Sequence, residues 1–116
     1  IYSLAGSGLI EVSNNGEKCT ISQREIKYIE SKKDYLKIYT YKTDFEINES
    51  LKIFMEKLDQ RIFVQTHRSK IVNLLYVLDM DKEWLYVNGG RRIPVSRRKY
   101  KEVHQKIIEF DKNWEG

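Results

Sequence analysis

The chain has 116 residues, of which 41% are hydrophobic and 33% are charged, and this composition suits one compact domain with a single core. Its one cysteine, Cys19, excludes an internal disulfide and is typical of a protein in the reducing cytoplasm. The net charge of +4 is modest, and no apolar run approaches the roughly 20 residues of a membrane-spanning helix, so we expect no membrane contact.

The chain shows no secretion signal, and it begins at Ile1 rather than at Met. We therefore interpret it as part of a longer protein, with residues 1–8 as the remnant of a linker from an upstream domain. No repeat or low-complexity segment divides the rest, so we expect a single domain over residues 1–116.

The first half of the chain has the pattern of β-strands. Residues 35–42 alternate Leu36 and Ile38 with Lys37 and Tyr39, which is the period of two that a half-buried strand shows. Asn15-Gly16 and Thr43-Asp44 are hairpin turn signals. The predicted strands of this half are 9–13, 18–21, 25–31 (after a turn), 35–42 and 44–48.

The second half begins and ends with helical patterns. Within ESLKIFMEKLD, residues 49–59, the apolar side chains recur at the spacing of one helix face, and they are Leu51, Phe54, Met55 and Leu58. A terminal helix from Arg97 has a similar stripe, formed by Tyr100, Val103, Ile107 and Phe110. Between them we predict strands at 62–67, 76–80, 83–87 and 91–95, with a hairpin turn at 88–90. Pro94 cannot donate a ladder hydrogen bond, so the strand 91–95 lies at a sheet edge or ends there.

This order of elements predicts a mainly β protein with antiparallel pairing and two short helices, because the strand-helix alternation of parallel sheets is absent. Catalysis is not expected. His67, His104 and Cys19 lack metal-ligand spacing, and no nucleotide-binding glycine motif is present. A set of Ser69, His67 and Asp44 has no nucleophile motif around it. We therefore predict no enzyme activity, cofactor or metal.

Positive charge gathers at the ends of predicted strands. The stretch RRIPVSRRKYK, residues 91–101, has six basic residues and no acidic one, whereas the rest of the chain has 15 basic and 17 acidic residues. Three polar clusters lie where a strand ends, and they are, in order, ESKKDY at 30–35, THRSKIVN at 66–73 and VSRRKYK at 95–101. Such side chains hold phosphate oxygens, and arginine or lysine also reads guanine edges. Local basic clusters on a nearly neutral body indicate a polyanion partner, although a solvated lysine-rich face remains the alternative.

The residues after Ser96 raise an electrostatic conflict. Ser96 is the predicted N-cap of the terminal helix, and Arg97, Arg98 and Lys99 crowd its first turn, where the helix dipole disfavours each cation by about 0.3–1 kcal/mol. A bound phosphate removes the conflict, because free backbone N–H groups and cations both bind it. Alternatively, the arginines turn back into solvent.

Four segments in order resemble the LytTR-type DNA-binding domain, the output module of many bacterial response regulators. They are IKYIESKKDYLKIYT, FEINESLKIFMEKL, FVQTHRSKIVNL and RRIPVSRRKYKEV. The resemblance extends from about Leu9 to Ile108, and THRSKIVN and IPVSRR are its most specific parts. It implies an elongated fold of stacked antiparallel β-sheets with short helices, in which loops grip double-stranded DNA. Two outer loops would enter successive major grooves, and a middle loop would touch the minor groove.

The resemblance also assigns residues to these three loops. The first loop would be residues 31–35, the second would centre on residues 67–69, and the third would be residues 96–98. Arg97 would be the main base reader, while Lys32, Lys33, Lys70 and Asn73 would mostly hold the DNA backbone. The implied DNA-binding set is Ser31, Lys32, Lys33, Thr66, His67, Arg68, Ser69, Lys70, Asn73, Ser96, Arg97 and Arg98. It further implies two copies on repeated half-sites, a possible dimer on DNA, and an upstream receiver or sensor domain.

Two other functions fit the sequence. A small β module that binds RNA or single-stranded nucleic acid would display aromatic side chains for base stacking, and Tyr35, Tyr39 and Tyr41 lie on one side of a predicted strand. A protein-interaction module, with incidental basic loops, is the third possibility. The simpler role for the three tyrosines is packing beneath a neighbouring sheet.

Overall fold

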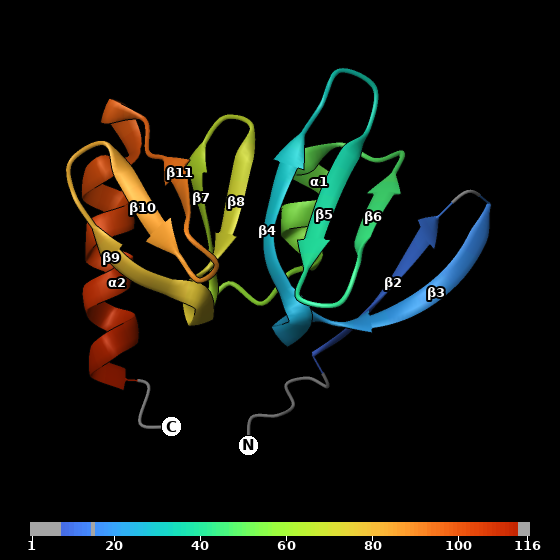
Figure 1. Cartoon of the computed structure of the whole chain (residues 1–116), viewed down its shortest axis with the longest axis horizontal. Coiled ribbons are helices and arrows are strands. Elements are labelled where there is room, and N and C mark those ends of the chain that lie inside the picture. The colour runs from blue at the N-terminus through green and yellow to red at the C-terminus, as the bar shows by residue number, and fades with distance from the viewer. Residues whose placement is uncertain (1–7, 15, 114–116) are drawn as a thin grey trace. The chain divides into compact units, whose positions relative to one another are not determined.

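The structure is a computed structural model, and it describes residues 8–14 and 16–113. The chain divides into two compact units, residues 1–59 and 60–116, and each is described by itself (Figure 1). Asn15 of the first predicted turn and most of the predicted linker remnant lie outside the described residues. Gly16 has a φ of 83°, a left-handed conformation that glycine adopts without strain, as the expected turn requires.

The first unit contains a hairpin and a three-stranded meander, all antiparallel. The hairpin pairs β2 with β3, and the meander pairs β5 with β4 on one side and β6 on the other. The elements in chain order are β2 (Leu9–Asn14), β3 (Glu17–Ser22), η1 (Gln23–Glu25), β4 (Ile26–Ser31), β5 (Leu36–Thr40), β6 (Asp44–Ile47) and α1 (Leu51–Lys57). Every strand predicted for this half is confirmed within a few residues.

The core of the first unit follows from the two periodicities in the sequence. On β5, Leu36, Ile38 and Thr40 are buried while Lys37 and Tyr39 are half-buried, which confirms the alternation. Helix α1 lies behind the meander (Figure 1) and buries its predicted stripe, with Leu51, Phe54 and Leu58 inside. The helix is shorter than predicted, because the Ser50 hydroxyl caps it by accepting the Ile53 N–H at 3.1 Å and Leu58 leaves the helical conformation.

The second unit combines a hairpin, a second three-stranded sheet and the terminal helix. The hairpin pairs β7 with β8, and the sheet has the order β11-β10-β9, both antiparallel. The elements are β7 (Phe63–His67), β8 (Lys70–Asn73), η2 (Leu74–Tyr76), β9 (Val77–Met80), β10 (Trp84–Val87), β11 (Arg91–Pro94), η3 (Arg97–Lys99) and α2 (Tyr100–Asn113). Pro94 ends the edge strand β11, as predicted. The core consists mainly of Phe63, Val64, Ile71, Val72, Leu85, Val87 and Val103.

Helix α2 is held against β7 by one buried side chain and by one lysine that donates two hydrogen bonds. Val103 is completely buried, and the Lys106 ammonium donates to the carbonyl oxygens of Gln60 (2.7 Å) and Phe63 (3.0 Å). Over residues 8–14 and 16–113, no helix is long and apolar enough to cross a membrane.

Two predictions for this unit were incomplete. Strand β8 was not predicted, since Ile71, Val72 and Asn73 are all buried and the segment shows no alternation. Helix α2 begins at Tyr100, because Arg97–Lys99 form a separate 3₁₀ turn.

Candidate nucleic-acid interface

The hairpin β7–β8 presents the second polar cluster on a two-residue turn. His67 pairs with Lys70 across the ladder, which leaves Arg68 and Ser69 as the turn residues. The Ser69 N–H donates to His67 Nδ1 at 3.2 Å, and the Ser69 hydroxyl oxygen lies 3.1 Å from the same nitrogen. The Arg68 side chain is exposed, whereas His67, Ser69 and Lys70 are half-buried. The turn therefore projects one guanidinium into solvent from a hydrogen-bonded frame.

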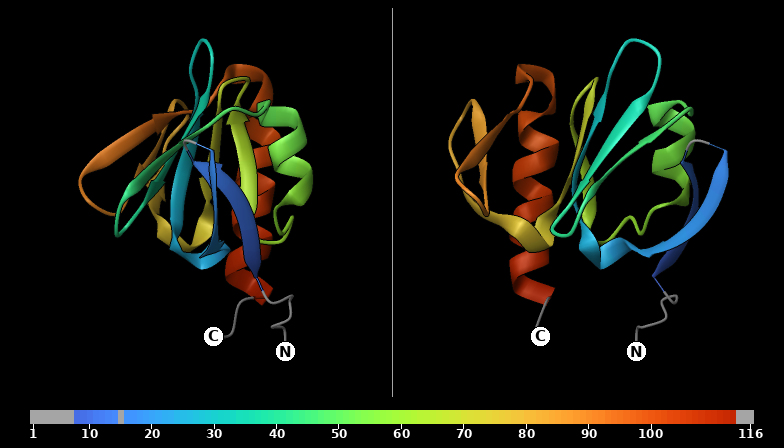
Figure 2. Two further views of the ribbon diagram at one scale, coloured as in Figure 1. Left: turned by 90° about the vertical axis from the view of Figure 1, so that its right-hand side faces the viewer. Right: turned by 45° about the vertical axis from the view of Figure 1, so that its right-hand side comes forward.

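The third polar cluster lies directly beside this turn. The Ser96 N–H donates to the carbonyl oxygen of Thr66 at 2.9 Å, and strand β7 also contacts η3. The Lys99 N–H in turn donates to the Ser96 carbonyl at 2.9 Å, which shapes the 3₁₀ turn that carries exposed Arg97 and Arg98. Both loops lie at the same end of the second unit in the views of Figures 1 and 2. Residues 30 positions apart in the sequence thus form one surface.

The arginines of this surface have no acidic partner among the described residues. Across the part of the chain that the structure describes, no carboxylate lies within ion-pair distance of Arg68, Arg97 or Arg98. Lysines elsewhere do have partners, such as Lys57 with Glu49 at 2.8 Å. Neighbouring cations repel each other, so such a cluster is most stable when an external anion lies between them.

The start of the terminal helix corrects the dipole argument. Ser96 precedes the 3₁₀ turn η3 and makes no side-chain capping bond, so it is not the N-cap of the α-helix. Arg97 and Arg98 therefore precede α2 instead of occupying its first turn. That turn contains Glu102, whose carboxylate lies 3.5 Å from the Lys99 ammonium and complements the dipole. The case for an anion site rests on the clustered cations alone.

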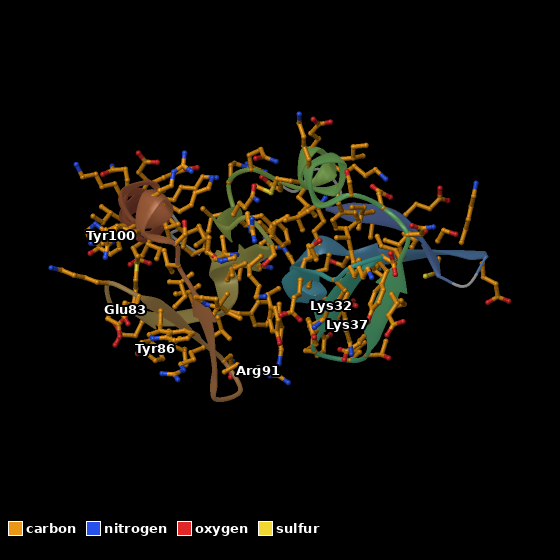
Figure 3. The ribbon with its side chains drawn as sticks, turned by 90° about the horizontal axis from the view of Figure 1, so that it is seen from above. Lys32, Lys37, Glu83, Tyr86, Arg91 and Tyr100 are labelled. Atoms are coloured by element: carbon orange, nitrogen blue, oxygen red, sulfur yellow. The ribbon has the colours of Figure 1, made fainter. Side chains whose placement is uncertain are left out.

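The basic stretch 91–101 is divided by the fold. Arg91 and Arg92 begin strand β11, whereas Arg97 and Arg98 follow its end, so roughly 15 Å of extended chain separates them. Figure 3 shows Arg91 and Tyr100 on opposite sides of this unit. The Arg92 guanidinium lies over the Trp84 ring, 4.0 Å from its centroid. Arg91 and Arg92 therefore belong to the β10–β11 hairpin and not to the candidate interface.

Two residues of the predicted set are corrected by their burial. The side chains of Thr66 and Asn73 are both 0% exposed, so neither reaches a ligand at the surface. Asn73 caps η2, with its amide oxygen accepting the Leu75 N–H at 2.8 Å. Thr66 contributes its backbone carbonyl, which holds Ser96 in place. Both residues shape the surface from beneath.

The first polar cluster lies in the other unit, on the loop between β4 and β5. The Lys32 N–H donates to the Tyr35 carbonyl at 2.8 Å and closes the loop, on which Lys33 and Asp34 are exposed. The Lys32 ammonium is 2.8 Å from the Glu30 carboxylate, and this hydrogen bond raises the pKa of Lys32 above 10.5. Ser31 is half-buried, and its hydroxyl donates to the Lys32 carbonyl at 3.4 Å. Figure 3 shows Lys32 with Lys37 on this unit.

Sequence reasoning missed one residue of the second loop. The Gln65 side-chain amide donates to the Arg68 carbonyl at 3.4 Å, which braces the turn. In the sequence, only its position three residues before Arg68 could indicate this hydrogen bond, and that spacing has a meaning only when the hairpin turn at Arg68-Ser69 is known. Among the described residues, no group of three or more His, Cys, Asp or Glu side chains is placed to hold a metal ion.

Comparison with known proteins extends these observations. Residues 9–108 match the family described as the LytTr DNA-binding domain. The sensory transduction protein LytT of Bacillus subtilis (strain 168) is 25% identical over 107 residues, which cover 87% of this chain and 44% of LytT. The chain thus spans less than half the length of that relative.

A solved structure shows the same fold. The LytTr DNA-binding domain of a methyl-accepting/DNA response regulator from Bacillus cereus is similar, with a TM-score of 0.72, 22% identity, and coverage of 89% of this chain and 98% of that one. The predicted fold class, mainly β with antiparallel strands and short helices, is thereby confirmed.

Proposed function

The chain belongs to the LytTr DNA-binding domain family, and from this premise we propose that it binds duplex DNA through its second and third loops as a transcription regulator's output domain. The resemblance found in the four sequence segments is confirmed by the match, which covers most of the chain. The family is not enzymatic. The proposal assigns the DNA contacts to particular residues and adds an upstream domain.

The hydrogen bond from the Ser96 N–H to the Thr66 carbonyl carries this proposal. It brings Arg68 on one loop and Arg97 and Arg98 on another to the same end of one unit, with no carboxylate to neutralise them in the described chain. Arginine can bind guanine with two hydrogen bonds or hold a phosphate, so these three cations can serve both sequence reading and backbone binding. Arg97 is the proposed base reader.

The remaining predicted contacts have supporting roles in this proposal. Lys70 and the lysines of the first loop, Lys32 and Lys33, hold phosphates. His67, Ser69, Ser96 and Ser31 are half-buried and shape or flank the loops. LytT is a sensory transduction protein more than twice as long as the matched region, which supports an upstream receiver or sensor domain. A cytoplasmic location and two copies on repeated half-sites are further parts of the proposal.

Binding to single-stranded nucleic acid is less well supported. A base-stacking platform needs free aromatic faces, but the Tyr39 ring is stacked on Tyr28 with centroids 4.3 Å apart. The Lys37 ammonium also lies 5.3 Å from the Tyr39 centroid, and the Tyr39 hydroxyl donates to Glu30 at 3.0 Å. Tyr39 is thus engaged within its own sheet.

Selection of bound sequences from a random duplex pool tests the proposed function. We expect enrichment of one motif, and single-stranded DNA of the same sequence should compete poorly at matched salt. If about six phosphates are held, affinity should fall by roughly 10³ between 50 and 200 mM salt. A preference for the single strand, or no enriched motif with a weak salt dependence, would overturn the proposal.

A further inference from the structure

The turn at Arg68-Ser69 lacks the residues that normally make a two-residue hairpin connection. Such turns favour glycine or asparagine, because one or both positions take a positive φ. The three-residue β10–β11 turn also uses glycine where φ is positive, with Gly89 and Gly90 at φ values of 98° and 78°. The β7–β8 turn has an arginine and a serine instead and follows a register shift between Gln65 and His67, and side-chain contacts to its backbone help to define its conformation.

The imidazole of His67 supplies one of these contacts. A backbone N–H can only donate, so the Ser69 N–H at 3.2 Å identifies Nδ1 of His67 as an acceptor without hydrogen. The hydrogen of the neutral ring is then on Nε2. A side-chain acceptor that binds the N–H two residues later reproduces the geometry of an Asx turn, here with histidine in place of asparagine.

Gln65 completes the arrangement from the same strand. Its amide donates to the Arg68 carbonyl, and this carbonyl belongs to the same peptide group as the Ser69 N–H. Side chains of β7 therefore hold both polar atoms of the single peptide that joins Arg68 to Ser69. Fixing this peptide plane restricts ψ of Arg68 and φ of Ser69, and so restricts the direction in which the Arg68 side chain leaves the turn.

We propose that His67 is a positioning residue whose Nδ1, together with Gln65, clamps the Arg68–Ser69 peptide and aims the Arg68 guanidinium at DNA. This inference rests on the proposed function, since it assumes that Arg68 contacts DNA. It changes the predicted role of His67, which acts on the turn instead of touching the DNA itself.

Three substitutions of His67 separate the two roles. In His67→Asn, the side-chain oxygen takes the place of Nδ1 and can accept the Ser69 N–H, but nothing remains at the position of Nε2. In His67→Gln, the amide nitrogen can reach the place of Nε2, but the longer side chain no longer places an acceptor at the position of Nδ1, so the hydrogen bond from the Ser69 N–H is lost. His67→Ala removes both. His104→Asn, on the exposed face of α2, is the matched control for loss of an imidazole.

Affinity for a selected duplex and for random duplex is measured for each variant, with thermal unfolding to verify the fold. We expect His67→Ala and His67→Gln to bind the selected duplex about tenfold more weakly, the upper range for one lost hydrogen bond. His67→Asn should stay within about twofold of the unchanged chain. Random duplex should be affected less, because orientation matters more for base reading than for charge. Near-normal binding by His67→Gln with loss in His67→Asn would instead establish a direct contact through Nε2.

Two measurements on the free protein keep this inference separate from DNA binding. Imidazole ¹⁵N NMR should show hydrogen on Nε2 of His67, and the Ser69 amide should exchange more slowly in the unchanged chain and in His67→Asn than in His67→Ala. Hydrogen on Nδ1, or a Ser69 amide that exchanges equally fast in all variants, refutes the clamp. If the clamp is present but no duplex is bound, the proposed function fails and the turn geometry stands.

Discussion

The loop between β4 and β5 differs from the two neighbouring loops of the second unit in whether its positive charges have acidic partners. Lys32 binds Glu30 at 2.8 Å within its own unit, whereas Arg68, Arg97 and Arg98 have no carboxylate within ion-pair distance in the described chain. A lysine with an internal partner must exchange that partner for a phosphate, while an unpaired arginine gains a partner on binding. The number of basic residues in a segment is therefore a weaker indicator of DNA binding than whether acidic side chains lie beside them in the folded protein.

The largest expected effect separates loss of the fold from loss of contacts. Phe54 is completely buried on α1, so Phe54→Ala should destabilise the protein by about 3–5 kcal/mol through lost burial and a cavity. Denaturant unfolding followed by circular dichroism measures this. Ile53→Ala on the same helix is the control, because Ile53 is 52% exposed and its loss should cost within about 0.5 kcal/mol. Equal effects at both positions would mean that α1 does not carry the core of its unit.

The unpaired arginines should matter most for sequence preference. Arg97→Ala is expected to reduce the preference for a selected duplex over random duplex by about 1–3 kcal/mol, because the proposed base contact is lost. Fluorescence anisotropy with both duplexes measures it. The control is Arg91→Ala, at the other end of β11. It removes the same charge outside the candidate interface, so the preference for the selected duplex should remain unchanged. An unchanged preference in Arg97→Ala contradicts its role as base reader.

A lysine of the same surface should act through charge alone. Lys70→Ala should weaken selected and random duplex alike, and it should lower the slope of log affinity against log salt by about 1. Lys18→Ala, on the exposed side of β3, is the control. A loss confined to the selected duplex would assign Lys70 to base reading instead.

The smallest effect tests the paired lysine of the first unit. Glu30→Gln removes the anion beside Lys32 but keeps an oxygen for the Tyr39 hydroxyl, so duplex affinity should rise slightly at low salt. The control is Glu25→Gln, which frees Lys42. A decrease in affinity would show that Glu30 orients Lys32 toward DNA.

The same substitution has a predicted effect on titration. Glu30 raises the pKa of Lys32, so the pair contributes stability below the ordinary pKa of 10.5 and loses it as pH rises through the higher folded value. In Glu30→Gln the pKa of Lys32 should move down toward 10.5, which NMR titration of the lysine side chain can follow. An unchanged pKa would mean that the ion pair does not form in solution.

Much of the fold could be predicted, because local patterns specify it. Alternation on β5 and the apolar stripe of α1 both correspond to buried faces. The strand β8 escaped prediction because its last three side chains are all buried without alternation, and the apolar residues Leu74 and Leu75 that follow it hide its end. The helical start at Arg97 was also wrong, since the stripe that begins at Tyr100 does not distinguish an α-helix from a preceding 3₁₀ turn.

The candidate site was predicted less completely. Charge and hydrogen-bonding capacity identified Arg68, Arg97 and Arg98, whose exposure fits their proposed role. Thr66 and Asn73 have equally suitable side chains for phosphate binding, yet both are buried. Residue type gives the chemistry that a side chain can perform, and only the packing around it decides whether a ligand can reach it.

The sequence by itself determined the periods of β5 and α1, the hairpin turn at residues 88–90 and the presence of basic clusters at strand ends, because these depend on neighbours along the chain. Tertiary structure decided that the Thr66 carbonyl meets the Ser96 N–H, which joins two of the clusters. It also decided that Arg91 and Arg92 lie apart from Arg97 and that Glu30 neutralises Lys32. The physical reason is that Coulomb energies and hydrogen bonds depend on distance in space, and the distance along the chain does not give it.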